Sequence, residues 1–179
     1  MEIRLAKTAG FCFGVDRAVQ MTRRLLDAGE KVATLGPLIH NPQVVAELEA
    51  RGAKVAASPA GVPPGYKVVI RSHGVPRSVY GELEALGIPW ADATCPFVAK
   101  IHAIARRAEQ EGACLAVAGD AAHPEVQGIV GHTRGESFVF ANLEELRAWK
   151  GPENPEKRIF AVAQTTFQAT KWQECSEFL

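Results

Sequence analysis

Short apolar runs alternate with amphipathic segments along most of the chain. Continuous apolar runs, typical of strands buried on both faces, predict strands at 32–35, 66–70, 114–118, 138–140 and 159–162. Apolar residues at helical spacing predict helices at 15–27, from 41–42 to about 51, from 97 onward and near 124. Because strands that alternate with amphipathic helices form βαβ units, the pattern predicts an α/β fold of repeated small parallel sheets.

The chain repeats itself at an offset of 83 residues. Over the 29 residues from Cys12 to His40, eight positions are identical to those from Cys95 to His123. The identical pairs are Cys12/Cys95, Val15/Val98, Arg23/Arg106, Arg24/Arg107, Gly29/Gly112, Ala33/Ala116, Gly36/Gly119 and His40/His123. Each repeat therefore supplies one thiol and one imidazole, which predicts two related α/β units, 1–94 and 95–179, that share one centre.

The polar residues of interest lie at the ends of predicted strands and helices. His40, His73, His123 and the segment 164–166 each follow a predicted strand. Open parallel sheets bind ligands at this carboxyl edge, so these residues are candidates for one binding site. Cys12 and Cys95 instead begin predicted helices, where the helix dipole stabilises the thiolate that binds metals.

The remaining cysteines and histidines receive structural predictions. Cys114 lies inside an apolar run and is expected to be part of the core, and Cys175 lies in a polar, helix-like tail and receives no role. His102 and His132 are expected on helix surfaces.

Composition narrows the class of protein. The formal net charge of zero over 179 residues gives no basic surface of the kind that nucleic-acid binding needs. No apolar run approaches the roughly 20 residues that span a bilayer, so no membrane segment is predicted. Residues 1–5 lead into a charged strand rather than a signal peptide. The four cysteines are more typical of free thiols or metal ligands than of a set of disulfides. We therefore expect a cytoplasmic protein.

Two thiols and several imidazoles are compatible with more than one metal. Thiolates suit zinc or iron–sulfur clusters. The sequence has no C-x-x-C pair of the kind common in zinc sites, and one cysteine per repeat favours a cluster at the junction of the units. A zinc-dependent hydrolase or zinc-stabilised domain using Cys12, Cys95 and the strand-end histidines remains an alternative.

Six motifs, in order, run from the first strand to about Thr166. They are Gly10-Phe11-Cys12-Phe13-Gly14-Val15, Gly36-Pro37-Leu38-Ile39-His40-Asn41-Pro42, Arg71-Ser72-His73-Gly74-Val75, Asp92-Ala93-Thr94-Cys95-Pro96, His123-Pro124-Glu125-Val126 and Gln164-Thr165-Thr166. Together they closely resemble the hydroxymethylbutenyl diphosphate reductase family, also called LytB or IspH.

The resemblance implies a trefoil of three α/β units around an iron–sulfur cluster, expected to be of the 4Fe–4S type. It implies the last step of the methylerythritol phosphate route, in which (E)-4-hydroxy-3-methylbut-2-enyl diphosphate loses its hydroxyl and gives isopentenyl and dimethylallyl diphosphates. The implied partners are this small allylic diphosphate and an electron donor of the ferredoxin or flavodoxin type.

The resemblance also implies ligand roles for the repeated residues. Cys12 and Cys95 would be ligands of the cluster, and His40, His73 and His123 would bind the diphosphate. An imidazole suits this task because it titrates near neutral pH and can meet an anion as a cation.

The implied catalytic residues are Glu125, His123 and Thr166. Glu125, two residues past His123 at a helix start, would feed protons to the substrate's hydroxyl. Thr166 would lie beside it, in contact with the substrate.

One part of the family pattern is missing up to Leu179, namely a third unit with its own cysteine and a Ser/Asn set for the diphosphate. In the second unit, Gln164-Thr165 occupies the position that Ser72-His73 occupies in the first, 92 residues later. A further unit of this repeat would have its cysteine on the order of 10–20 residues past Leu179. We therefore expect a partial chain of the reductase, whose residues 1–11 pack with the third unit. A catalytically silent module that binds diphosphate is the alternative.

Overall fold

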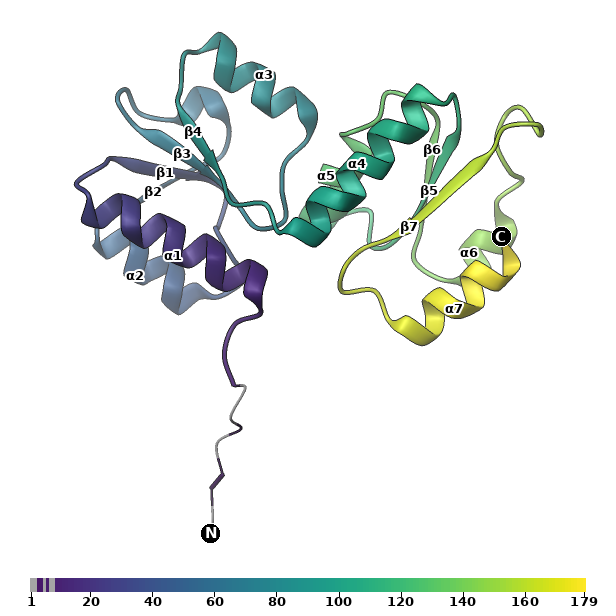
Figure 1. The fold of residues 1–179 in the computed structure, drawn as a ribbon, viewed down its shortest axis with the longest axis horizontal. Helices are drawn as coiled ribbons and strands as arrows, with labels where there is room; N and C mark the ends of the chain where they lie inside the picture. The colour runs from purple at the N-terminus through teal and green to yellow at the C-terminus, as the bar shows by residue number, and fades with distance from the viewer. Residues whose placement is uncertain (1–2, 5, 7–8) are drawn as a thin grey trace.

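The computed structural model describes residues 3–4, 6 and 9–179. Within this part of the chain, two parallel sheets are each covered by helices on both faces (Figure 1). The α/β prediction is confirmed. The predictions for residues 1–5 and 1–11 fall in part on residues 1–2, 5 and 7–8, which lie outside the described residues.

The first sheet has the strand order β2-β1-β3-β4, and all neighbouring pairs are parallel. Its strands are β1 (Val32–Leu35), β2 (Lys54–Ala56), β3 (Lys67–Ile70) and β4 (Trp90–Asp92). The helices of this unit are α1 (Phe13–Asp27), α2 (Pro42–Ala50), a short 3₁₀ helix η1 (Pro59–Gly61) and α3 (Arg77–Ala85). Helices α1 and α2 cover one face of the sheet and α3 covers the other (Figure 1).

The second sheet has the order β6-β5-β7, again parallel throughout. Its strands are β5 (Cys114–Ala118), β6 (Ser137–Phe140) and β7 (Ile159–Ala163). Its helices are α4 (Pro96–Gln110), α5 (Pro124–Val130), α6 (Leu143–Ala148) and α7 (Ala169–Phe178). Helices α4 and α5 pack on one face, and α6 and α7 pack on the other.

The central strands β1 and β5 are buried at every position because both faces of each sheet are covered. In the first sheet Val32 and Val69 pack toward α1 and α2, whereas Ala33 and Ile70 pack toward α3 around Leu83. These five side chains are completely buried. Covering both faces removes the polar alternation that a half-exposed strand would show, which explains why β1 and β5 match the predicted ranges.

The helices begin where the sequence signals indicate. The Asn41 side chain accepts a hydrogen bond from the Val44 backbone N–H at 3.1 Å, and Pro42 follows as the first residue of α2. Cys12 and Cys95 occupy the N-cap positions of α1 and α4, and Pro96 is the first residue of α4. Each cysteine is therefore presented at the positive end of a helix of 15 residues.

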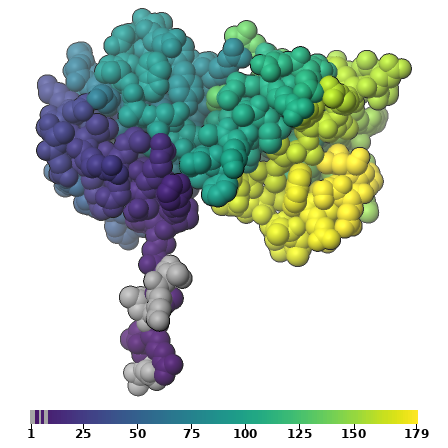
Figure 2. Space-filling model, viewed as in Figure 1, coloured from purple at the N-terminus to yellow at the C-terminus, as the bar shows by residue number. Residues whose placement is uncertain are grey.

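The two units contact each other through the loops around α3 and α5. The Arg77 backbone N–H donates to the Gly131 carbonyl at 3.0 Å, and His132 Nε2 lies 3.1 Å from the Val75 carbonyl. Figure 2 shows the two lobes in contact, with the teal-to-green atoms of α4 between them. The boundary predicted at residues 94 and 95 coincides with the start of α4, and it stays a prediction.

The prediction that His102 and His132 lie on helix surfaces is wrong. They are 3% and 6% exposed, and their rings stack with centroids 3.9 Å apart at this junction. Burial lowers the pKa of His102 to about 3, with smaller contributions from His132 and Arg106, so the ring is neutral at pH 7. A helix surface that faces solvent in one unit is here covered by the other unit, which periodicity alone cannot reveal.

The cysteines of the second unit lie in its core. Cys114 is fully buried, as predicted. Cys175 is also fully buried, because α7 packs this position against Phe140 and Leu146, so its surroundings are apolar rather than the expected polar tail. None of the described helices combines the length and the apolar character needed to cross a bilayer.

Replacing Gly131 with alanine is expected to destabilise the junction by about 1–3 kcal/mol. A Cβ at Gly131 would lie 2.5 Å from Pro76 Cβ and 2.9 Å from Pro76 Cα, and the backbone of Pro76 cannot yield easily. Gly81 is the matched control, because it lies inside α3 with open space around its Cα. Gly81→Ala should stabilise by about 0.5–1 kcal/mol through helix propensity. Urea unfolding of both variants checks this, and shifts of equal sign would contradict it.

Candidate functional site

Three histidines from both units meet at the carboxyl edges of the two sheets. His40 lies between β1 and α2, His73 follows β3, and His123 is the N-cap of α5 after β5. The ring centroids of His40 and His73 are 4.6 Å apart, and that of His123 lies 5.6 Å and 5.4 Å from them. Residues far apart in the sequence therefore form one cluster, which we call the histidine cluster.

The electrostatics of the histidine cluster favour an anion. Burial, together with the charges of His40, His123 and Arg71, lowers the pKa of His73 to about 4. All the charges that act on His73 are positive, so protonation without an anion is unfavourable. Arg71 adds a half-buried guanidinium beside Gly36, whose φ of 72° favours glycine. His73 Nδ1 is buried and has no hydrogen-bond partner among the described residues.

His123 can donate to an anion while neutral. Its Nδ1 accepts the backbone N–H of Glu125 at 3.1 Å, which caps α5. The ring proton of the neutral form must therefore sit on Nε2, leaving that nitrogen as a hydrogen-bond donor. A metal ion at Nε2 would need the lone pair there and would break the cap. Although nitrogen atoms of the three histidines lie within 4.8 Å of one another, this tautomer argues against a zinc site.

Pyrophosphate binding at the histidine cluster is expected to take up protons. Without an anion His73 is neutral at pH 7, because its pKa is about 4. The negative charge of a bound anion stabilises the protonated imidazole and so raises this pKa. The complex then binds more protons than the empty site, so affinity rises as pH falls toward that range. Calorimetry at pH 7 in buffers of different ionisation enthalpy should show an uptake of up to about one proton beyond that of a His73→Gln variant. Equal uptake by both proteins would contradict this reading.

The carboxylate of Glu125 is fixed by a residue that the sequence analysis did not single out. Glu125 is 2% exposed, and both its oxygens are hydrogen-bonded by Thr165. The Thr165 backbone N–H donates to Oε1 at 2.6 Å, and the Thr165 hydroxyl donates to Oε2 at 2.8 Å. Glu125 follows His123 on α5, so one short helix start places an imidazole and an oriented carboxylate side by side.

Thr166 is held by a different partner. The Gln164 amide donates to the Thr166 hydroxyl oxygen at 2.8 Å, while its carbonyl oxygen accepts the Asp120 backbone N–H at 3.1 Å. The Thr166 oxygen accepts in this contact, so its own O–H remains available to a ligand. Both threonines lie in one motif of the sequence, but only the structure shows that Thr165 is the one that contacts Glu125. The substrate contact of Thr166 stays a prediction.

Cys12 and Cys95 come from segments that are far apart in the sequence and approach each other in the structure. A Cβ added to Gly14, two residues after Cys12, would lie 2.6 Å from Cys95 Sγ and 2.9 Å from Cys95 Cβ. Cys12 is exposed and Cys95 is half-buried. Two thiols at the N-termini of helices that approach each other are a donor set that fits two ligand positions of an iron–sulfur cluster. Their ligand role stays a prediction.

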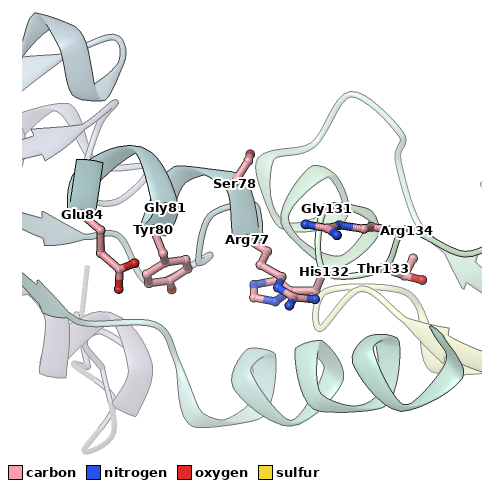
Figure 3. A pocket seen from close by; sticks show the side chains of 9 residues that line it. All are labelled: Arg77, Ser78, Tyr80, Gly81, Glu84, Gly131, His132, Thr133 and Arg134. Carbon is pink, nitrogen blue, oxygen red and sulfur yellow. The ribbon is translucent and has the colours of Figure 1, made fainter. Parts of the chain in front are cut away.

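A separate cavity of about 490 Å³ lies between α3 and the turn after α5. Arg77, His132 and Arg134 project from its walls (Figure 3). Neither the cysteines nor the histidine cluster line it, so it is not part of the site. A cavity of about 540 Å³ with mainly apolar walls does include His40.

Comparison with protein families gives a match over nearly the whole chain. The sequence profile of the family described as "LytB protein" matches residues 3–179. The chain belongs to the LytB family. The resemblance expected from the six motifs is thereby confirmed, and the motifs that carry the site residues all lie within the matched range.

Two similar curated proteins carry the same name. The chain is 41% identical over 167 residues to the 4-hydroxy-3-methylbut-2-enyl diphosphate reductase of Oleidesulfovibrio alaskensis, which covers 93% of this chain and 59% of that protein. It is 45% identical over 166 residues to the enzyme of the same name from Geotalea uraniireducens, with 93% and 57% covered. The chain thus spans a little under 60% of the length of these relatives.

Solved structures agree with this placement. The structure of (E)-4-hydroxy-3-methyl-but-2-enyl diphosphate reductase, the terminal enzyme of the non-mevalonate pathway, matches with a TM-score of 0.82 at 37% identity. That match covers 98% of this chain and 62% of the other. The E-1-hydroxy-2-methyl-but-2-enyl-4-diphosphate reductase from Plasmodium falciparum matches with a TM-score of 0.87 at 25% identity, covering 96% and 54%.

Proposed function

We propose that the protein acts, at its full natural length, as a 4-hydroxy-3-methylbut-2-enyl diphosphate reductase. The observation that carries the proposal is that the histidine cluster, the oriented carboxylate of Glu125 and the close approach of the Cys12 and Cys95 segments occur together in one fold. Its relatives in the LytB family bear this name. The substrate would be (E)-4-hydroxy-3-methylbut-2-enyl diphosphate.

The reaction breaks the C–O bond of the substrate's hydroxyl and forms one C–H bond. Two electrons and two protons enter, the oxygen leaves as water, and isopentenyl and dimethylallyl diphosphates are the products. An iron–sulfur cluster, which membership in the family implies and which we propose to be of the 4Fe–4S type, supplies the electrons and a Lewis-acidic iron when bound. Cys12 and Cys95 would hold it in this chain.

The residues of the chain would divide the remaining work between binding and proton transfer. The histidine cluster and Arg71 would bind the diphosphate, with His123 donating from Nε2. Glu125 would transfer a proton to the departing hydroxyl, because Thr165 fixes both carboxylate oxygens and so sets the direction of the group. Thr166 would offer its free O–H to the substrate.

The electron donor in this proposal is a small ferredoxin or flavodoxin. A cytoplasmic location is part of the proposal, because thiolate ligands persist in a reducing compartment.

Anaerobic turnover by the protein at its full natural length tests the proposal. With chemically reduced methyl viologen as electron donor, we expect oxidation of the dye that depends on substrate and yields both isomeric products. Tight diphosphate binding without dye oxidation would instead support the silent binding module.

A further inference from the structure

The helix that carries Cys12 is tied to the turn that carries Cys95 by one arginine. Arg17, one turn into α1, donates from Nη1 to the Thr94 carbonyl at 3.1 Å and from Nη2 to the Asp92 carbonyl at 3.2 Å. Both acceptors lie in the three residues before Cys95. A guanidinium is suited to this task because its planar fork presents several donors in a fixed geometry.

Gly14 allows the same two segments to approach closely. It is buried in the first turn of α1, and any side chain there would meet Cys95 at its sulfur, 2.6 Å from the added Cβ. Its backbone conformation needs no glycine, because its φ is not positive. The requirement for glycine is therefore one of space beside the Cys95 thiol.

The turn before Cys95 is itself held in place. The Asp92 carboxylate accepts the Thr94 backbone N–H at 2.8 Å and the Tyr80 hydroxyl at 3.0 Å. The Cys95 backbone N–H donates to the Ser72 carbonyl at 2.9 Å. Arg17 thus connects α1 to a turn that is already fixed against the first sheet, so its two bonds set where Cys12 lies relative to Cys95.

We propose that Arg17 and Gly14 are positioning residues that hold Cys12 and Cys95 as a preorganised dithiol before any metal arrives. The inference rests on the proposed function, which assigns the two thiols to one cluster. Its physical basis is that fixing two groups in advance removes the entropy cost of bringing them together when they bind. Arg17 touches neither thiol in the contacts above and acts through the turn.

A trivalent arsenical tests the preorganisation without iron. Phenylarsine oxide forms two As–S bonds with a pair of adjacent thiols, and its oxygen leaves as water with the two thiol protons. The metal-free protein at its full natural length should bind one equivalent, and Cys12→Ser and Cys95→Ser variants should lose this adduct. Arg17→Gln should weaken binding by about 10-fold, as expected for the loss of two hydrogen bonds from a charged group.

Arg24→Gln is the matched control, because Arg24 is an exposed arginine on the same helix and its loss should leave arsenical binding unchanged. Iodoacetamide labelling of the two thiols, which needs no pair, should be the same in both arginine variants. Unchanged arsenical affinity in a folded Arg17→Gln variant would overturn the inference. If that variant does not fold by circular dichroism, Gly14→Ala provides the second test, with the same expected loss.

The outcome is independent of the reductase assay. If the protein reduces no substrate but its arsenical affinity depends on Arg17, the inference is supported and the proposed function is contradicted. Conversely, an active reductase whose arsenical affinity is unchanged by Arg17→Gln and by Gly14→Ala would support the proposed function and overturn the inference.

Discussion

Cys95→Ser, in the protein at its full natural length, is expected to remove most of the bound iron and to lower turnover by more than about 100-fold. Loss of a group that only supports a metal ligand already costs about 10–100-fold, so loss of a ligand should cost more. The serine hydroxyl keeps the size of the side chain but does not ionise near neutral pH. Iron content after anaerobic purification, together with turnover, measures the effect.

Cys114→Ala is the control for the cysteine experiment. Cys114 is fully buried in β5 and packs in the core of the second unit, so its replacement should lower stability without removing iron. Full iron content in the Cys95→Ser variant would contradict the ligand assignment. Equal iron loss in the Cys114→Ala variant would show that the measurement reports folding instead.

Glu125→Gln is expected to lower kcat by about 10²–10⁴-fold, the usual contribution of a positioned acid, and to change KM little. Glutamine keeps the shape, its oxygen can accept the Thr165 backbone N–H and its NH2 can donate to the Thr165 hydroxyl oxygen, but it cannot supply an acidic proton. The diphosphate contacts proposed for the histidine cluster and Arg71 are left intact, which is why the effect should appear in kcat. Steady-state kinetics with the reduced dye separate the two constants.

Glu82→Gln, an exposed position on α3, is the matched control and should behave as the unaltered protein. Unchanged kcat in Glu125→Gln would remove Glu125 from the proton path. A rise in KM alone would assign Glu125 to substrate binding instead.

The sequence was most informative where burial is complete and the signal is local. The strands β1 and β5 match their predicted ranges because every position faces a covered side of a sheet. Asn41 caps α2 as its residue type predicts. In contrast, β2 and β4 have only three residues each, too few for a pattern. Helix α3 was not predicted, because Gly81 in its middle has a low helix propensity and Leu83 is its one fully buried residue, so the segment shows no clear apolar periodicity.

The candidate site was partly accessible to sequence reasoning. The rule that ligands bind at the carboxyl edges of parallel strands selects His40, His73 and His123, and the structure brings them within 4.6–5.6 Å of one another. The role of Thr165 was not accessible, because two adjacent threonines follow β7 and only the tertiary fold decides which one faces Glu125.

Contacts between segments account for what else was missed. The space that Gly14 leaves for Cys95 depends on how α1 meets the turn after β4, and a glycine near a helix start carries no signal of it. The error on His102 and His132 has the same origin, since each becomes buried only when the second unit packs against the loops of the first.

Whether Cys12 and Cys95 hold an iron–sulfur cluster is decided by the iron, acid-labile sulfide and zinc content of the protein, purified without oxygen at its full natural length. We expect iron and sulfide in equal amounts, with little zinc, and loss of iron and sulfide in the Cys12→Ser variant. Zinc without sulfide would contradict the cluster and would instead assign Cys12 and Cys95 to a zinc site. Absence of both metals after reconstitution would leave a protein that binds diphosphates but cannot reduce them.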